Sequence, residues 1–343
     1  MATEQDTGSS LPQHMRAWRF TAPGPLDKSF KLLEDIPTPA TSLKSGEILI
    51  KVAWASINPA DYKIPEMGLV ARAMMSFPTT AGMDLSGHVH SAAADVSDID
   101  VGDAVFARVD PFRREGSISE YVVVPRDGYA KLPAGCALDK AAGAPTVALT
   151  AYQCIAPYVK AGDQVFINGG SGGTGTFGIQ IAKVLGCRVI TSCSTGKIDL
   201  CQRLGADEII DYKKDNVVQK LREKGPILSL VVDNVGDNPA DLYTSSGEFL
   251  RPEGTYTLIA GNASNIFKGM MLPRFLGGGN RKFVFVLTKN NHETLSQIAD
   301  WMGKGDLETV VDSKFKFEEG LDAFKRLKEG SCAGKVVICV ADD

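Results

Sequence analysis

A cluster of glycines near the middle of the chain has the spacing of a phosphate-binding turn. Residues 170–175 read GSGGTG, which fits G-x-G-x-x-G, and they lie between a short apolar run and an apolar pattern at helical spacing. Gly170 is expected to permit a tight turn, Gly172 to let the backbone approach a pyrophosphate, and Gly175 to let helix and strand pack closely. Backbone N–H groups at the helix start would face the phosphates, and the alternative is a glycine-rich turn without a ligand. The residues expected to bind the dinucleotide here are Gly170, Gly172, Gly173, Thr174 and Gly175.

The end of the next strand indicates which dinucleotide is bound. An NAD-binding unit usually has an acid about 20 residues after the glycines, where it holds the ribose 2′-hydroxyl. Here the strand ends in Ser192 and Ser194, with Lys197 just beyond, and the first carboxylate, Asp199, lies inside the next expected helix. Small hydroxyls and a lysine suit a 2′-phosphate, so the sequence favours NADPH over NADH. The alternative for Lys197 is an ordinary solvated lysine in the first turn of a helix.

The surrounding pattern supplies the elements that must position these residues. Up to about residue 149 the chain is β-rich, with expected strands at 15–20, 47–57, 85–93, 103–109 and 119–124. Strands and helices then alternate in a βαβ pattern, which predicts a doubly wound parallel sheet. Its expected strands are 164–169, 187–193, 208–211, 228–236, 255–261 and 282–288, and its expected helices are 172–186, 198–206 and 216–225. Two further helices, 292–305 and 318–330, and a strand, 334–340, end the chain.

Length and composition exclude several classes of function. A chain of 343 residues with 44% hydrophobic and 23% charged residues is typical of a soluble protein of two domains. The net charge of -4 argues against nucleic acid as a partner, and no apolar stretch is long enough to span a membrane. Seven scattered cysteines without a CxxC pair indicate reduced thiols and a cytoplasmic protein. Residues 1–14 are expected to form a flexible arm.

Several motifs, taken in order, resemble those of the medium-chain dehydrogenase/reductase superfamily. They are SINPADYK, AGMDLSG, LTAY, INGGSGGTGTFGIQIAK, LGADEIIDY and GKVV. The resemblance is strongest to the zinc-free quinone oxidoreductase and enoyl reductase branch. It implies an α/β protein with a GroES-like β-rich catalytic domain, made of residues 15–149 and 288–343, and a Rossmann domain of residues 150–287. The active site would lie between the two domains.

The resemblance also bears on zinc. Relatives that are alcohol dehydrogenases hold a catalytic zinc through a cysteine, a histidine and a second cysteine. The first two positions here are Asn58 and Met83, and the third falls in a segment without cysteine. An amide and a thioether are poor zinc ligands, so no metal is expected. His88 and His90, with Asp84 nearby, could be proposed as metal ligands, because residues i and i+2 of a strand point the same way. Without an obvious third ligand we interpret the two histidines as surface or packing residues.

Without a metal, reduction of a C=C bond conjugated to a carbonyl is easier than oxidation of an alcohol. Negative charge would move onto the carbonyl oxygen as hydride reaches the β-carbon, and hydrogen-bond donors would stabilise it. Segment 58–63 holds the best donors, and in similar proteins it lines the nicotinamide side of the cleft. Lys63 is expected to contact the cofactor ribose or the substrate oxygen, and Tyr62 is the candidate proton donor. The catalytic candidates are Asn58, Asp61, Tyr62 and Lys63, with Asp61 expected to orient Lys63.

Alternatives stay open for these side chains: Tyr62 could be a packed aromatic, and Asp61 a turn or capping acid. By the resemblance, Thr150 lies near the nicotinamide, Tyr212 and Lys197 flank the 2′-phosphate, and Lys335 reaches the phosphates. The resemblance also places three residues at strand ends bordering the dinucleotide, namely Asn234, Ile259 and Val286. Ile259 and Val286 are equally suited to the core.

The sequence therefore predicts an NADPH-dependent reductase of small apolar enone, enoyl or quinone substrates. The alternative is an NADPH-binding sensor or interaction protein with little turnover, because a fold by itself does not fix a function. Three interpretations are open for the Met- and Phe-rich segment 267–280: it borders an apolar pocket, it forms a mobile loop, or it makes a subunit contact. An exposed strand at 282–286 would favour a homodimer.

Overall fold

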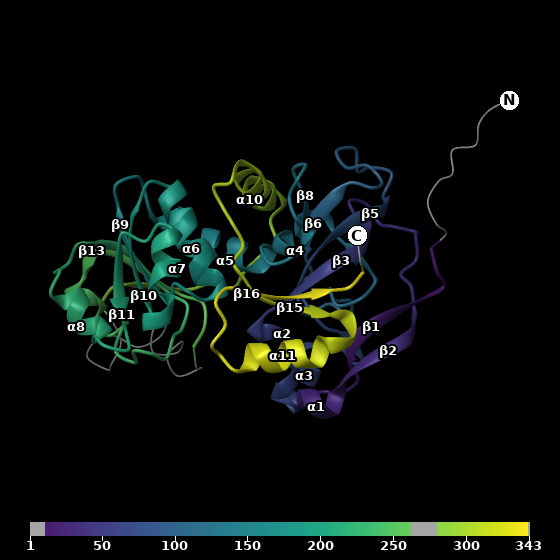
Figure 1. Cartoon of the computed structure of the whole chain (residues 1–343), viewed down its shortest axis with the longest axis horizontal. Helices are drawn as coiled ribbons and strands as arrows, with labels where there is room; N and C mark the ends of the chain where they lie inside the picture. The colour runs from purple at the N-terminus through teal and green to yellow at the C-terminus, as the bar shows by residue number, and fades with distance from the viewer. Residues whose placement is uncertain (1–10, 262–279, 342–343) are drawn as a thin grey trace.

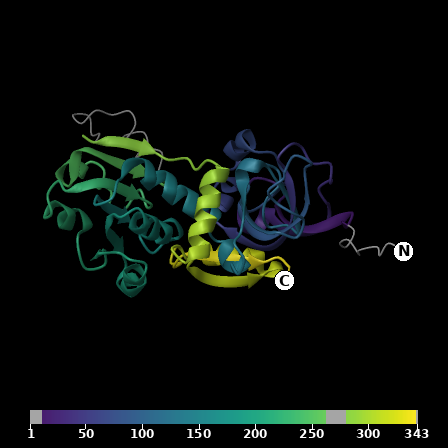
Figure 2. The same ribbon diagram turned by 90° about the horizontal axis from the view of Figure 1, so that it is seen from above.

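The computed structural model describes residues 11–261 and 280–341, which form two lobes side by side (Figures 1 and 2). One lobe is β-rich and holds the N-terminal half together with the C-terminal segment, and the other holds the parallel sheet. Most of the expected arm, residues 1–10, lies outside the described residues, as does most of segment 267–280. His14, which was assigned to the arm, already belongs to the first strand.

The β-rich lobe contains two sheets. A three-stranded sheet has the order β2-β1-β4, and a seven-stranded sheet has the order β15-β16-β3-β5-β6-β8 with β7 also paired to β3. The strands are β1 (His14–Phe20), β2 (Phe30–Pro37), β3 (Ile48–Ile57), β4 (Thr79–Thr80), β5 (Asp84–Ala92), β6 (Ala104–Arg108), β7 (Tyr121–Val124), β8 (Tyr129–Lys131), β15 (Val311–Lys316) and β16 (Lys335–Cys339). The helices are α1 (Leu26–Ser29), α2 (Pro59–Lys63), α3 (Leu69–Met74), α4 (Leu138–Ala141), α10 (His292–Lys304) and α11 (Gly320–Lys328).

The C-terminal strand β16 returns to the centre of the first lobe. It pairs antiparallel with β3, so that Val336 lies opposite Ile57. Strand β5 lies on the other side of β3, and β6 follows it, with Asp84 opposite both Ser56 and Arg108. Residues that are far apart in sequence therefore meet at one end of the neighbouring strands β16, β3, β5 and β6.

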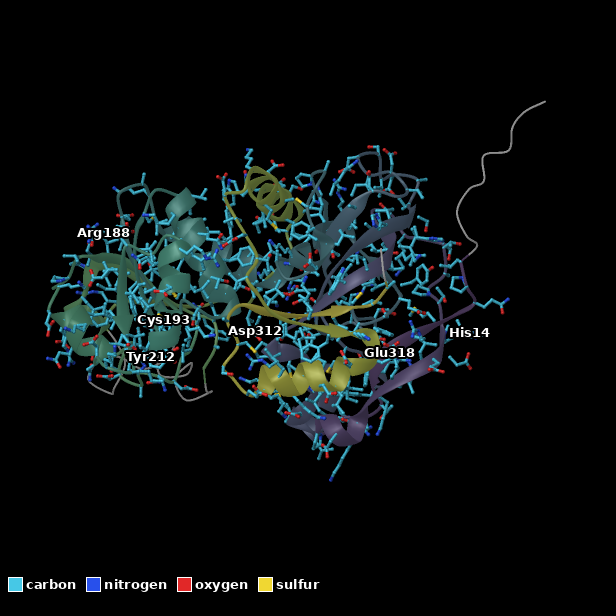
Figure 3. The ribbon with its side chains drawn as sticks, viewed as in Figure 1. His14, Arg188, Cys193, Tyr212, Asp312 and Glu318 are labelled. Carbon is cyan, nitrogen blue, oxygen red and sulfur yellow. The ribbon has the colours of Figure 1, made fainter. Side chains whose placement is uncertain are left out.

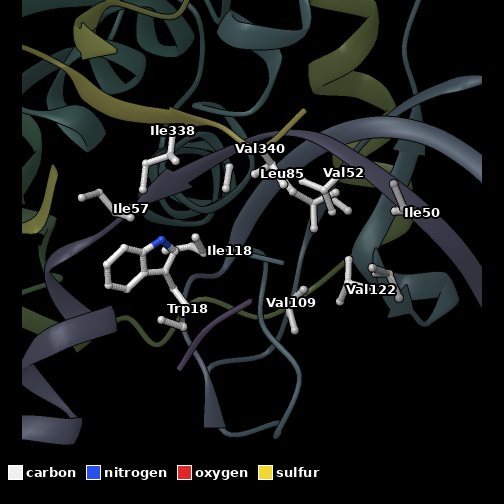
Figure 4. Packing of buried hydrophobic residues seen from close by; sticks show 14 of the residues in the cluster. Trp18, Ile50, Val52, Ile57, Leu85, Val109, Ile118, Val122, Ile338 and Val340 are labelled. Carbon is white, nitrogen blue, oxygen red and sulfur yellow. The ribbon is translucent and has the colours of Figure 1, made fainter. Parts of the chain in front are cut away.

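The core of this lobe is formed by apolar side chains from both sheets, and Figure 4 shows Trp18 among valines and isoleucines from β3, β7 and β16. The indole N–H of Trp18 donates to the carbonyl oxygen of Phe317 over 2.6 Å, so the one polar atom of this buried ring is paired. Burial of these large apolar side chains stabilises the lobe, which holds the polar residues at the ends of its strands in place.

The second lobe is built on a six-stranded sheet in which all strands are parallel. Its order, β11-β10-β9-β12-β13-β14, reverses between β9 and β12, and ligands of such sheets bind at this switch point beyond the carboxyl ends of the strands. The strands are β9 (Gln164–Asn168), β10 (Arg188–Cys193), β11 (Glu208–Asp211), β12 (Leu228–Asp233), β13 (Leu250–Leu258) and β14 (Lys282–Phe285). The helices are α5 (Pro145–Ile155), α6 (Gly173–Val184), α7 (Ile198–Arg203) and α8 (Val217–Arg222).

The predicted fold class, a β-rich lobe beside a doubly wound parallel sheet, is confirmed. Helix α5, which lies between the lobes in Figure 1, was not predicted. Eight of its eleven residues are buried, so its sequence shows no polar face from which a helical period could be read. None of the helices described is long and apolar enough to cross a membrane.

Candidate functional site

The phosphate-binding turn, residues 169–175, connects the end of β9 to the start of α6. The left-handed conformation that requires glycine is at Gly169, where φ is 77°, and not at Gly170, as the sequence suggested. Gly170 is required for close packing instead, because an added Cβ would overlap the hydroxyl oxygen of Thr191 on β10. The close packing expected at Gly175 is confirmed, since its Cβ would overlap the carbonyl oxygen of Gly169.

A buried hydrogen-bond network connects this turn to the ends of β9, β10, β12 and β13. Ser192 Oγ accepts the N–H of Gly169 over 3.0 Å and donates to Asn168 Oδ1 over 2.6 Å. The amide of Asn168 in turn donates to Asp233 Oδ1 over 2.9 Å, and Tyr256 donates to the other carboxylate oxygen over 2.5 Å. Ser192 was predicted to contact the cofactor, and the structure places its hydroxyl beneath the turn.

The turn and its surroundings fit a dinucleotide. Helix α6 begins at Gly173 with no acidic residue in its first turn, so its free N–H groups offer an anion site of favourable charge. Next to it, Asn234 donates to the carbonyl oxygen of Asn168 over 2.9 Å, while its own Oδ1 is buried and has no partner among the described residues. An unpaired buried acceptor is unfavourable, and a hydroxyl or amide of a bound cofactor would satisfy it.

The end of β10 forms the edge of this site expected to take the 2′-phosphate. Ser194 directly precedes the short helix η4 (Thr195–Lys197), and its carbonyl oxygen accepts the N–H of Lys197. The backbone N–H of Tyr212 donates to the carbonyl oxygen of Cys193, so the tips of β10 and β11 lie together (Figure 3). An acid that the sequence analysis overlooked, Asp211, also lies here. It is buried and accepts hydrogen bonds from Thr195 Oγ1 and the backbone N–H of residue 213, so it is already paired.

In the β-rich lobe, three buried side chains form a group that we name the cleft cluster, namely Asn58, Asp84 and Lys335. The ammonium group of Lys335 donates to Asn58 Oδ1 over 2.5 Å and to Asp84 Oδ2 over 3.1 Å. Asn58 Nδ2 donates to the same carboxylate oxygen over 2.9 Å. All three side chains are at most 5% exposed, so this is a buried ion pair with a shared amide.

Lys335 connects the cleft cluster to the phosphate-binding turn. Gly334, which precedes it, bridges to Gly172, and the Lys335 stem passes 3.1 Å from the position of a Cβ on Gly173. The ammonium group, which was expected to reach the phosphates, is bonded to Asn58 and Asp84 of the cluster.

A second buried cation lies beyond the cluster. Asp84 Oδ1 accepts both the hydroxyl and the backbone N–H of Thr146, over 2.6 and 2.8 Å. The same hydroxyl accepts from the guanidinium of Arg108 over 3.2 Å, and Arg108 also donates to Asn290 Oδ1 over 2.7 Å. Desolvation lowers the pKa of Arg108, and the neighbouring Asp84 opposes this effect. One carboxylate therefore faces two buried cations.

The residues at the expected zinc positions do not fit zinc. Asn58 Oδ1 accepts a hydrogen bond from the ammonium group of Lys335, and Met83 Sδ lies 4.0 Å from a guanidinium nitrogen of Arg108. An amide and a thioether beside two fixed positive charges form a poor site for a divalent cation. No three His, Cys, Asp or Glu side chains gather in a metal-binding group in residues 11–261 and 280–341. His88 and His90 contact the carbonyl oxygen of residue 102 and the ring of residue 121, respectively.

Asp61 lies between the cleft cluster and a pocket. Its Oδ2 accepts the backbone N–H of Asn58 over 2.7 Å, which caps α2. Burial raises the pKa of Asp61 to about 7, a change that the N–H of Asn58 opposes and Asp84 reinforces. The pocket is a small, partly open hollow with about 20 Å³ of space for the centre of a water molecule, and its lining includes Asp61, Ala60, Met75, Met83, Pro111 and Arg113.

Two predicted catalytic side chains lie elsewhere. The ring of Tyr62 packs edge-on against Phe324 of α11 at 6.4 Å, and the ammonium group of Lys328 lies 5.1 Å from its centroid. Lys63 is exposed at the end of α2. Asp61 Oδ2 accepts the backbone N–H of Asn58, and the expected role of Asp61 in orienting Lys63 stays a prediction.

The remaining predicted cofactor residues are buried or half-buried in the second lobe. Thr150 is buried in α5, and its hydroxyl donates to the carbonyl oxygen of Thr146 over 2.6 Å and pairs with Thr288 over 2.5 Å. Ile259 and Val286 follow β13 and β14 directly and pack against the apolar core of the second lobe.

The structure adds to the candidate site several partners of the predicted residues, namely Arg108, Thr146, Asn168 and Asp233, and it gives Asp84, considered from the sequence only beside His88 and His90, a place in the cleft cluster. Asp84 stands in the quoted motif AGMDLSG, so a signal existed for it. Arg108 and Thr146 carry no local signal, because they reach the site only through strand pairing and the unpredicted helix α5.

Comparisons with known proteins agree with this architecture. Residues 44–134 match the family model described as alcohol dehydrogenase GroES-like domain, and residues 204–338 match the one described as zinc-binding dehydrogenase. A trans-enoyl reductase, pgmF, from Aspergillus terreus is 38% identical, over 96% of this chain and 97% of its own. A 2-methylene-furan-3-one reductase from Solanum lycopersicum is 31% identical, over 98% of this chain and 82% of its own. The solved quinone oxidoreductase from Coxiella burnetii is 30% identical, with a TM-score of 0.82 over 95% of this chain and 99% of its own.

Proposed function

The chain belongs to the medium-chain dehydrogenase/reductase superfamily, in its quinone oxidoreductase and enoyl reductase-like part, and on that premise we propose that it is a zinc-independent, NADPH-dependent reductase of enones, enoyl compounds or quinones. The coarser statement, that it is an oxidoreductase of this superfamily with a nicotinamide cofactor, follows from its relatives.

The observation that carries the proposal is the cleft cluster. At the position where zinc-dependent relatives use a metal, this chain has a buried ammonium group, Lys335, held by Asn58 and Asp84. A fixed cation can stabilise negative charge on a carbonyl oxygen, but it cannot bind and acidify an alcohol as a metal does. The arrangement therefore favours reduction of an acceptor that becomes an enolate or a hydroquinone.

The second lobe would bind the cofactor, and the β-rich lobe would bind the acceptor and stabilise its developing charge. When bound, NADPH supplies a hydride to the β-carbon of the acceptor. The phosphate-binding turn and the start of α6 hold the pyrophosphate, and Asn234 offers its unpaired oxygen to the bound cofactor. Lys335 and Arg108 provide the positive potential near the developing oxyanion. The open pocket beside Asp61 receives the apolar substrate.

The preference for NADPH rests on the residues at the tip of β10. Ser194 and the half-buried Lys197 flank the expected position of the 2′-phosphate, and Tyr212 is exposed beside them. Asp211, at the end of β11, accepts the hydroxyl of Thr195, so the carboxylate already binds a group of the chain itself. A lysine with small hydroxyls is the arrangement expected to favour a phosphorylated ribose.

The names of the relatives support the choice of acceptor. Two of them are named for reduction of enoyl or methylene-furanone compounds, and a third is named an NADPH-dependent alkenal/one oxidoreductase. We further propose a cytoplasmic enzyme whose catalytic domain comprises residues 15–149 and 288–343 and whose Rossmann domain comprises 150–287. Strand β14 lies at the edge of the parallel sheet, where it could pair with a second copy.

Steady-state oxidation of NADPH and NADH over a panel of enones and quinones tests the proposal. We expect turnover of at least one acceptor class, with higher kcat/KM for NADPH. Tight NADPH binding without turnover of any acceptor would favour the sensor or interaction role instead. Stoichiometric zinc in active protein, lost together with activity on chelation, would contradict zinc independence.

A further inference from the structure

Reduction of an enone requires a proton at the α-carbon after hydride has reached the β-carbon, and the sequence analysis assigned this proton to Tyr62. In the structure Tyr62 does not line the pocket. Its ring is packed against Phe324 of α11 and lies under the ammonium group of Lys328. Two side chains of the last helix therefore contact the ring of Tyr62, which is not part of the pocket lining.

The carboxyl group that does line the pocket is Asp61. It is only 8% exposed, and its position is fixed because Oδ2 accepts the backbone N–H of Asn58 over 2.7 Å. No group of the described chain donates to its second oxygen, Oδ1, so this oxygen is free to carry a proton. We propose that the Asp61 carboxyl group delivers the proton to the α-carbon of an enone substrate in this pocket.

The surroundings of Asp61 favour the protonated acid that this role needs. Burial is the main cause that raises its pKa, to about 7, and the nearby Asp84 carboxylate raises it further. Lys335 and Arg108 oppose this shift, and both already interact with Asp84, through the ammonium group and through Thr146. The other charged groups that line the pocket are Asp110, Arg113 and Glu115, and Lys63 follows on the same helix.

The step balances. The C=C bond gains a hydride at the β-carbon, its π electrons form the enolate, and the enolate α-carbon takes the proton from Asp61. Asp61 is left as a carboxylate, and water entering the open pocket protonates it again. Reduction of a quinone needs no proton on carbon, because a hydroquinone oxygen takes its proton from water. The role of Asp61 is thus specific to enones, and it rests on the proposed function.

The test compares Asp61→Asn with the wild-type enzyme on an α-methyl cyclic enone and on a quinone, both in D₂O. Asparagine keeps an oxygen to accept the Asn58 N–H but has no acidic proton. We expect enone kcat/KM to fall roughly 100-fold and deuterium at the α-carbon to lose its facial preference. The Kd for NADPH and the thermal unfolding temperature should stay close to the wild-type values, which verifies that the variant is folded, and quinone reduction should fall much less than enone reduction. Asp95→Asn is the matched control, because this exposed carboxylate also accepts a backbone N–H, from Gly46.

Each outcome decides the proposal. An unchanged enone rate, or a reduced rate with the original face of protonation, would overturn it in favour of another donor. If Asp61→Asn does not fold, the wild-type pH profile decides, because enone kcat must fall as pH rises through about 7 and a flat profile overturns the role. Failure of the wild-type enzyme to reduce any enone would instead defeat the enone arm of the proposed function, and the inference with it.

Discussion

On the cofactor side of the cleft, the phosphate-binding turn is held by short neutral side chains, whereas on the catalytic side the cleft cluster is held by buried charges. The turn depends on Ser192 and Asn168, with the carboxylate of Asp233 lying one bond further from it. The cluster joins Lys335 directly to Asp84, with both side chains at most 3% exposed. At the neutral turn, the N–H groups at the start of α6 would stabilise the negative charge of a bound pyrophosphate. At the charged cluster, the buried cations would stabilise negative charge that develops only during the reaction.

The difference predicts unequal costs of substitution. A buried ion pair contributes little net stability, but removal of one partner leaves an uncompensated charge and is expensive. A neutral hydrogen bond contributes about 1 kcal/mol. The catalytic side should therefore be far more sensitive to the loss of a single side chain than the cofactor side.

The largest effect is expected for Lys335→Met. It leaves the Asp84 carboxylate buried without its cation, so the free energy of unfolding should fall by roughly 3–5 kcal/mol. Urea denaturation at neutral pH measures the change. The matched control is Lys314→Met, which removes a half-exposed lysine from its pair with Asp139 and should cost no more than about 1 kcal/mol. Equal losses in the two variants would remove the contrast between the two sides of the cleft.

The next effect separates two glycines of the phosphate-binding turn. In Gly175→Ala the new methyl group would overlap the carbonyl oxygen of Gly169, so both stability and cofactor affinity should fall, by about 1–3 kcal/mol in stability. In Gly172→Ala the nearest atom is 3.6 Å away, so the fold should tolerate the change. NADPH affinity should nevertheless fall, because the methyl group faces the pyrophosphate.

Thermal unfolding and calorimetric titration with NADPH, applied to both variants, would test this pair. The interpretation of Gly172 as a point of close approach to the cofactor is wrong if Gly172→Ala binds NADPH as tightly as the wild-type protein. The packing argument for Gly175 is wrong if its variant unfolds at the wild-type temperature.

These two sides also differ in how far they could be predicted from the sequence. The turn is contiguous, so its glycines and the βαβ context predicted it, although the glycine with positive φ is Gly169 and not Gly170. The cleft cluster has no such signature. Asn58, Asp84 and Lys335 come together only because β3 pairs with β5 on one side and with β16 on the other. Strand pairing of this kind is not encoded in local spacing, and it decides which donor meets which acceptor.

Tyr62 and Asp61 illustrate the same limit at a single helix. Both stand in one short motif, and no local pattern distinguishes which of them lines a pocket. The distinction depends on α11, which lies near the C-terminus in sequence and whose Phe324 and Lys328 contact the ring of Tyr62. The doubly wound sheet, in contrast, was predictable because its repeated pattern is local.

A smaller effect is expected for Lys197→Ala, at the tip of β10. Loss of one cation from a phosphate site should weaken NADPH binding roughly 10–100-fold, while NADH, which lacks the phosphate, should bind nearly as before. Calorimetric Kd values for both cofactors provide the measurement, with NADH as the internal control. An equal loss for the two cofactors would show that Lys197 does not contact the 2′-phosphate.

The smallest effect is expected within the neutral network, and it distinguishes support from contact. Ser192→Ala removes the acceptor of the Gly169 N–H and the donor to Asn168, so stability should fall by about 1 kcal/mol. Because the whole turn loosens, NADPH and NADH should weaken by the same few-fold factor. Ser194→Ala is the matched variant, since its side chain makes no capping bond to η4. It should leave stability unchanged and weaken NADPH alone. If Ser192→Ala were to discriminate between the two cofactors, its hydroxyl would have to reach the 2′-phosphate, and the separation of a supporting serine from a contacting serine at the end of β10 would fail.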